Sequence, residues 1–191
     1  MNEHLAWTAI FLLGCYHGIN PGMGWLFAVA LGLQERRIAA VFRAIVPLAL
    51  GHVASVAIVV LLAVIAAHEL PQPALHRATA AILFAFGAYR LIRVRHPRWV
   101  GMRVGFWGLT LWGFLMSTAH GAGLMLVPFV TTVAGWLMVG VHTLGYLVTM
   151  SAVAVLVYAK LGVSFLRSAW FNVDIVWAVA LIVTGIVALF A

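Results

Sequence analysis

The sequence predicts an all-α integral membrane protein of six transmembrane helices, in which helices one and four are interrupted. Three observations lead to this fold class. The chain of 191 residues is 65% hydrophobic and only 8% charged, whereas about a quarter of the residues in a soluble domain are charged. The basic residues gather in three short clusters. Finally, glycines and prolines lie inside two apolar runs that are too long for one perpendicular helix.

The apolar runs set the order of the six spans. At about 20 residues for each crossing, the chain forms a single transmembrane domain, residues 1–191. An outer loop, His68–Arg77, is expected because Pro71 and Pro73 end a helix. The expected spans are about Ala6–Leu33, Ala44–Ala67, Thr79–Leu91, Val104–Ala134, Leu137–Tyr158 and Ala169 to the end.

The basic clusters indicate the orientation in the membrane. They occupy alternate loops, which the positive-inside rule assigns to the cytoplasm. Both termini are then expected outside a bacterial-type inner membrane. The same placement makes the lipid bilayer the expected partner and argues against nucleic acid, despite the net charge of +7. The clusters are Arg36, Arg37 and Arg43; Arg90, Arg93, Arg95, Arg98 and Arg103; and Lys160 and Arg167.

An internal repeat is visible in the interrupted runs. HGINPGM at residues 17–23 is matched by HGAGLML at residues 120–126, and LGHVASVAIVVLL in span two by LGYLVTMSAVAVLV in span five. Span four starts on the opposite side from span one. The sequence therefore predicts two inverted three-helix repeats, about 5–95 and 103–191. Interrupted helices in such repeats indicate a transporter site near the middle of the membrane.

Four histidines inside the expected spans are the candidate metal ligands. Ionisable side chains in a membrane are costly and usually face the bundle interior or a water path, and neutral imidazole binds late first-row metals. Asn20 and Met23 follow His17 at helical spacing, so a break there brings the three side chains together. The candidate binding residues are His17, Asn20, Met23, His52, His120 and His142, with the four histidines as metal ligands.

The first of these segments resembles a known family. HGINPGM resembles the HGLEPGH motif of the nickel/cobalt efflux permeases, the NicO family of the LysE-type transporter superfamily. LALGHVASVAIV resembles the second-helix segment of that family, so the resemblance covers roughly residues 12–62. It implies that His17 and His52 are substrate-site residues. Asn20 stands where the family has glutamate and Met23 where it has histidine, which favours a softer ion or a solute that is not a metal.

These observations predict a secondary permease or exporter, most simply for a transition-metal cation, rather than an enzyme. No Walker motif is present, and Cys15 is the only cysteine, so neither a disulfide nor a CxxC pair can form within the chain. Binding should weaken as the pH falls through the imidazole range. Three alternatives stay open: a b-type haem protein with histidine axial ligands, an exporter of an amino acid or other small solute, and a non-transporting membrane subunit. No cofactor is certain, and a homo-oligomer or a partner subunit stays open.

Overall fold

The computed structural model describes residues 3–92, 105–130, 133–161 and 173–190. Every regular element within these ranges is a helix, so the all-α prediction is confirmed there. The loop that carries Arg93–Arg103, and Arg167 after the fifth expected span, lie outside the described residues. The description of the fold therefore concerns the helices and not these basic loops.

The first expected span is broken where its sequence predicts. Helix α1 (Glu3–Ile19) is followed by a single 3₁₀ turn, η1 (Pro21–Met23), and then by α2 (Trp25–Glu35). Gly24 has φ 112°, a left-handed conformation that favours glycine. Asn20 caps η1, because its side-chain oxygen accepts a hydrogen bond of 2.7 Å from the amide of Gly22. Proline, glycine and a capping side chain together account for the break.

The fourth expected span is interrupted as well. Helix α5 (Phe106–Ala119) is capped by His120, and a second 3₁₀ segment, η2 (Leu124–Phe129), follows. Between them Gly121 has φ 67°. Pro128 lies inside η2, where it cannot donate a backbone hydrogen bond.

Two helices among the described residues are long and apolar enough to cross a membrane. One is α3 (Ile38–Glu69), which begins before the expected second span and includes Pro47. The other is α6 (Gly135–Leu156), which continues into a π-helical turn, η3 (Val157–Leu161). The six-span arrangement as a whole remains a prediction.

The prediction of a long outer loop between spans two and three is wrong. Helix α3 continues to Glu69, and α4 (Gln72–Ile92) begins only two residues after Leu70. Proline is tolerated at the start of a helix, where its missing N–H has no intrahelical partner. Pro73 therefore lies in the first turn of α4 and does not extend the loop.

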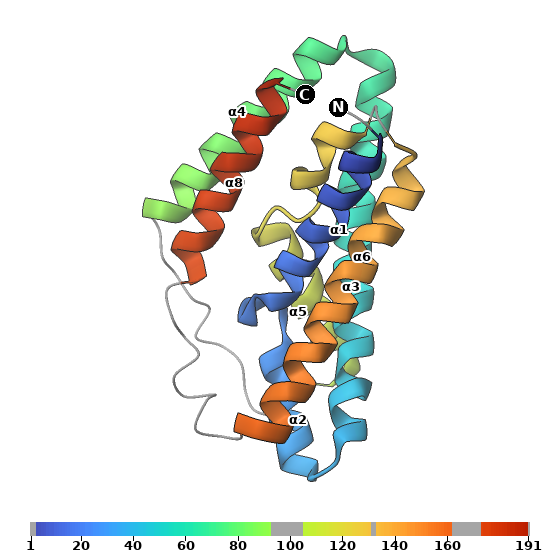
Figure 1. The fold of residues 1–191 in the computed structure, drawn as a ribbon, viewed down its shortest axis with the longest axis vertical. Helices are drawn as coiled ribbons and strands as arrows, with labels where there is room; N and C mark the ends of the chain where they lie inside the picture. Colours follow the sequence, from blue (N-terminus) through green and yellow to red (C-terminus); the bar gives the residue numbers. More distant parts are fainter. Residues whose placement is uncertain (1–2, 93–104, 131–132, 162–172, 191) are drawn as a thin grey trace.

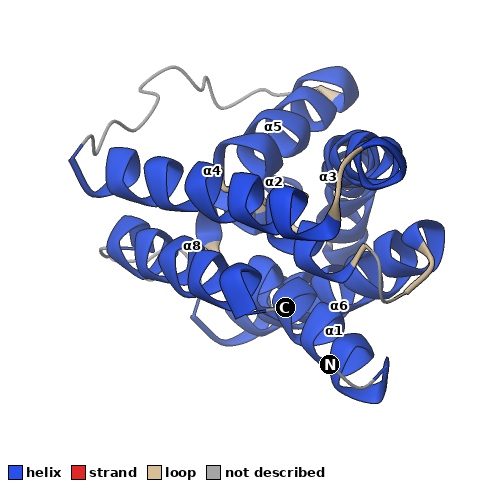
Figure 2. Ribbon diagram, turned by 90° about the horizontal axis from the view of Figure 1, so that it is seen from above, coloured by secondary structure: helices blue, strands red, loops and turns tan. Residues whose placement is uncertain are grey.

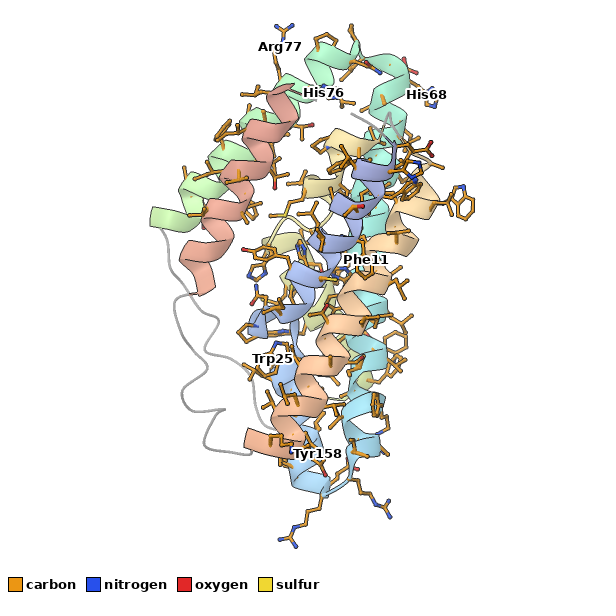
Figure 3. All side chains as sticks on the ribbon, viewed as in Figure 1. Phe11, Trp25, His68, His76, Arg77 and Tyr158 are labelled. Carbon is orange, nitrogen blue, oxygen red and sulfur yellow. The ribbon has the colours of Figure 1, made fainter. Side chains whose placement is uncertain are left out.

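The helices pack in three pairs. Helix α1 lies along α6, α3 along α5, and α4 along α8 (Val173–Phe190). Figure 1 shows α4 and α8 side by side, to one side of the bundle that the other helices form. Figure 2, seen from above, again shows α4 and α8 running alongside each other. In Figure 1, the start of α1 and the end of α8 lie at the same end of the molecule. Figure 3 places His68, His76 and Arg77 at this end and Tyr158 at the opposite one.

Glycines allow α1 and α6 to approach to backbone contact. A Cβ atom placed on Gly14 would lie 2.0 Å from the carbonyl oxygen of His142, and one on Gly145 would lie 2.4 Å from that of Phe11. No real side-chain atom fits at these distances. The glycines therefore set the separation between the helices that carry His17 and His142.

Helices α3 and α5 approach in the same way. A Cβ atom on Gly51 would lie 2.0 Å from the carbonyl oxygen of Thr110, and one on Gly113 would lie 2.3 Å from that of Leu48. His52 follows Gly51 directly on α3. Its position is thus fixed by close packing against α5.

Two apolar clusters form the core of the bundle. The Trp25 cluster lies around η1 and α2, and the Phe129 cluster lies around η2 and the start of α6. The buried members of the Trp25 cluster are Met23, Trp25, Ala28, Val29, Val41, Ala44, Ile45, Leu48, Leu109, Tyr146, Met150, Ala154 and Val157. The buried members of the Phe129 cluster are Ala6, Ile10, Val56, Val60, Ala122, Leu126, Phe129, Val133 and Met138.

Candidate functional site

Three of the four predicted histidines converge from three helices. His17 on α1, His52 on α3 and His142 on α6 are each fully buried. The ring centres lie 5.1 Å apart for His17 and His142, 5.4 Å for His52 and His142, and 6.1 Å for His17 and His52. We call these three side chains the histidine layer.

The layer lies between the two apolar clusters. On α6, Met138 of the Phe129 cluster lies one turn before His142, and Tyr146 of the Trp25 cluster lies one turn after it. The same order holds around His52 on α3, in the opposite chain direction. The histidines thus form a polar layer with packed apolar side chains on both sides.

Two further residues, Tyr146 and Ser117, hold the His52 ring. Tyr146 stacks on His52 with ring centres 3.9 Å apart and an angle of 11° between the planes. Ser117 on α5 shares a hydrogen bond of 2.7 Å between its Oγ and the Nδ1 atom of His52. Sequence reasoning did not assign either residue to the site. The signal for Tyr146 was available, since LGY in span five is matched with LGH in span two.

The layer contains buried nitrogens that lack hydrogen-bond partners. These are Nε2 of His52 and both ring nitrogens of His142. The His142 ring interacts with the carbonyl of Ile10, but the contact does not have the geometry of an ordinary hydrogen bond. The Nδ2 atom of Asn20 is unpartnered as well. A buried polar group left without a partner costs about 1–3 kcal/mol. Several such groups close together are typical of a site that binds something polar.

The His17 ring is oriented by its own helix. Its Nδ1 atom donates to the carbonyl oxygen of Leu13 at 2.8 Å. A neutral imidazole that donates from Nδ1 carries its lone pair on Nε2. In a metal site, such a backbone hydrogen bond selects the coordinating nitrogen and orients the ring. His17 therefore has the local arrangement of an Nε2 ligand.

Asn20 and Met23 are positioned by the break itself. The Asn20 side chain is used in capping η1. Met23 is fully buried in the Trp25 cluster, and its carbonyl oxygen accepts a hydrogen bond of 3.4 Å from the hydroxyl of Tyr146. Trp112 on α5 donates to the carbonyl oxygen of Gly22 at 3.0 Å. The hydrogen bond from Trp112 connects η1, the break in the first span, to α5, the helix before the second break.

His120 occupies a different position from the other three histidines. It lies at the C-terminal end of α5, where its Nδ1 atom donates to the carbonyl oxygen of Met116 at 2.7 Å. A Cβ atom placed on Gly22 would lie 3.4 Å from its ring. His120, at the interruption after α5, thus lies against η1, at the interruption after α1.

The layer has the spacing of a metal site but not its final geometry. Two imidazoles that bind one ion through nitrogens about 2 Å from it place their ring centres about 5 Å apart, which is close to the distances from His142 to His17 and to His52. The planes of His52 and His142 are nearly parallel, at 14°. Among the described residues, no group of three or more histidine, cysteine or acidic side chains is arranged to hold a metal ion. An ion would bind only after at least one ring turned.

No protein-family model, curated protein or solved structure matches the chain. Membership of the NicO family therefore remains a prediction from the first two spans. The functional argument depends on the residues of the site themselves.

Proposed function

We propose that the chain is a secondary permease of a bacterial-type inner membrane, not an enzyme, and that it moves a transition-metal cation through the histidine layer. The observation that carries this proposal is the convergence of His17, His52 and His142 from three helices, with unpartnered nitrogens on His52 and His142. Dry packing alone gives no reason to bury such nitrogens together. A cation that binds them would remove their cost.

The exposed surface supports a membrane location. Large apolar side chains are exposed along α3, including Leu50, Ile58 and Leu62, where a soluble protein would place polar ones. Trp107 and Trp136 are also exposed, near the starts of α5 and α6. Tryptophan is enriched at membrane–water interfaces. These features are those of a bundle surrounded by lipid.

The paired glycine contacts support two inverted repeats. If α1 of the first repeat corresponds to α5 of the second, Gly14 corresponds to Gly113. Gly14 contacts a carbonyl of α6, and Gly113 contacts a carbonyl of α3, so the two helix contacts are equivalent. Gly145 and Gly51 correspond in the same way. This register differs by one helical turn from the one that matches His17 with His120.

The parallel rings of His52 and His142 suggest how such a permease would work. A transporter must bind its ion weakly enough to release it, so a fixed and complete ligand set is not required in every state. In the arrangement described, apolar side chains lie on both sides of the layer. We interpret it as the closed state, in which the rings stack on one another and on Tyr146.

The geometry supports haem binding less well. A porphyrin needs a flat slot between its two axial histidines. Helices α1 and α6 are in backbone contact at Gly14 and His142, which leaves no slot between His17 and His142. A small solute fits the buried nitrogens too, but the described layer offers no carboxylate to hold an amine.

Metal accumulation in cells tests the proposal. His52→Gln together with His142→Gln should abolish the change in cellular metal content that expression of the wild-type chain produces. His68→Gln is the matched control, because His68 is exposed at a helix end. Unchanged accumulation in a double variant that is present in the membrane at wild-type levels would overturn the proposal.

A further inference from the structure

The acidic residues of this chain are few, and the three glutamates lie at helix ends rather than in the histidine layer. The whole sequence has four: Glu3, Glu35, Glu69 and Asp174. The three glutamates are exposed at helix ends, and Asp174 is the second residue of α8. In the part of the chain that the structure describes, the layer is therefore built from neutral groups.

A neutral, dry layer discriminates between ions by charge. The electrostatic cost of moving an ion out of water grows with the square of its charge, so a monovalent ion pays about a quarter of the cost of a divalent ion of the same size. Sites for divalent ions usually offset this cost with carboxylates or thiolates. Imidazole nitrogens provide no negative charge. The layer is therefore better suited to a monovalent cation.

Buried thioether groups lie on both sides of the layer: Met138 is in the Phe129 cluster, and Met23 and Met150 are in the Trp25 cluster. Met23 and Met150 are fully buried in the same cluster as Tyr146, whose ring stacks on His52. The Tyr146 hydroxyl also donates to the backbone carbonyl of Met23, so the last residue of η1 is linked to the residue that stacks on His52. Thioether and imidazole together select copper(I) over harder ions.

We propose, building on the permease function above, that the ion taken by the histidine layer is a soft monovalent cation of the copper(I) type, with the Met23 thioether as a ligand beside the imidazoles. Copper(I) accepts low coordination numbers, so His52 and His142 with Met23 would suffice once a ring turns. Met23 lies next to Gly24, whose left-handed backbone starts α2. A small change at this junction would move the thioether relative to His52.

The test is metal binding by the purified full-length chain under anaerobic conditions. Copper(I) is supplied from a coloured competing chelator, and zinc(II), cobalt(II) and nickel(II) are titrated in parallel. Met23→Leu preserves the size of the side chain and removes the sulfur. It should weaken copper(I) binding at least about tenfold and leave binding of any divalent ion unchanged. Met125→Leu is the control, because Met125 is equally buried but packs against Leu83 and Leu181.

The outcomes separate this inference from the proposed function. If a divalent ion binds through the histidines more tightly than copper(I), or Met23→Leu has no effect, the copper(I) inference fails and the permease stands. If the folded chain binds no metal at all, both fail. X-ray absorption of the copper-loaded wild-type chain provides a reading that needs no variant: a sulfur scatterer beside nitrogen supports the inference, and nitrogen alone overturns it.

Discussion

Two glycines determine how closely the backbones of α1 and α6 approach beside the histidine layer. Gly14 touches the carbonyl of His142, and Gly145 touches that of Phe11. Close backbone approach through small residues is a common way to pack helices where the solvent is lipid. The positions of the His17 and His142 rings thus depend on residues that are not among the proposed ligands.

Gly14→Ala should destabilise the chain. The added Cβ would overlap the His142 carbonyl oxygen, so the helices must separate, at a cost of about 1–3 kcal/mol. Gly140→Ala on α6 is the matched control, because nothing lies within 4 Å of a Cβ placed there. Thermal unfolding of the purified variants in detergent should give a lower Tm for Gly14→Ala alone. Equal Tm values would show that α1 and α6 are not in backbone contact at Gly14.

At this scale, part of the site could be predicted from the sequence. A histidine inside an apolar run is visible as such, and His17, His52 and His142 were all assigned to the site. Their mutual distances could not be predicted, because they follow from glycine contacts between helices far apart in the chain. His120 shows the limit: its HG dipeptide matches that of His17, but His17 lies inside the last turn of α1, whereas His120 follows the last residue of α5 as its cap.

The interruption between α1 and α2 is the element that most clearly has a local cause. Asn20 accepts the Gly22 amide, Pro21 has no amide hydrogen, and Gly24 adopts a left-handed backbone. The side chain of Trp25 donates to the carbonyl oxygen of Ile19, which the end of α1 leaves without a helical partner. Since all these causes are local, the position of the break could be predicted from the sequence.

Asn20→Ala should loosen this element. Loss of a capping side chain costs about 0.5–2 kcal/mol, and the Gly22 amide would be left without its acceptor. Asn20→Ser retains an oxygen able to cap and should recover part of the loss. Thermal unfolding of the two variants beside the wild type measures this difference. If serine is no better than alanine, the hydrogen bond to Gly22 does not stabilise the break.

The connection between α3 and α4 shows why element boundaries are harder to predict. Pro71 and Pro73 were interpreted as helix breakers within a loop of ten residues. Proline prevents a helix from continuing through it but is accepted in the first turn of the next one. The two roles give the same sequence pattern, and only the structure shows that α4 has already begun by Gln72.

For the whole molecule, the distribution of basic residues predicts the orientation of the chain in the membrane. Arg36 lies in the turn between α2 and α3, and His68 lies at the other end of α3. Both are exposed. If α3 crosses the membrane, these two residues face opposite compartments, and the positive-inside rule places Arg36 in the cytoplasm.

Labelling with a membrane-impermeant maleimide measures this orientation. In a Cys15→Ser background, His68→Cys should react in intact spheroplasts, and Arg36→Cys should react only after the membrane is opened. The reverse pattern would invert the predicted topology. Reaction of both cysteines in intact spheroplasts would show that α3 does not span the membrane.

The order of polar and apolar layers along the bundle has a mechanical consequence. In the permease proposed above, an ion held by His52 and His142 would reach neither face of the bilayer until one of the two apolar clusters opened. Each cluster contains residues of one of the two 3₁₀ segments. Met23 of η1 belongs to the Trp25 cluster, and Leu126 and Phe129 of η2 belong to the Phe129 cluster. The two gates of such a carrier would thus coincide with the two 3₁₀ segments, η1 and η2, that interrupt the expected first and fourth spans.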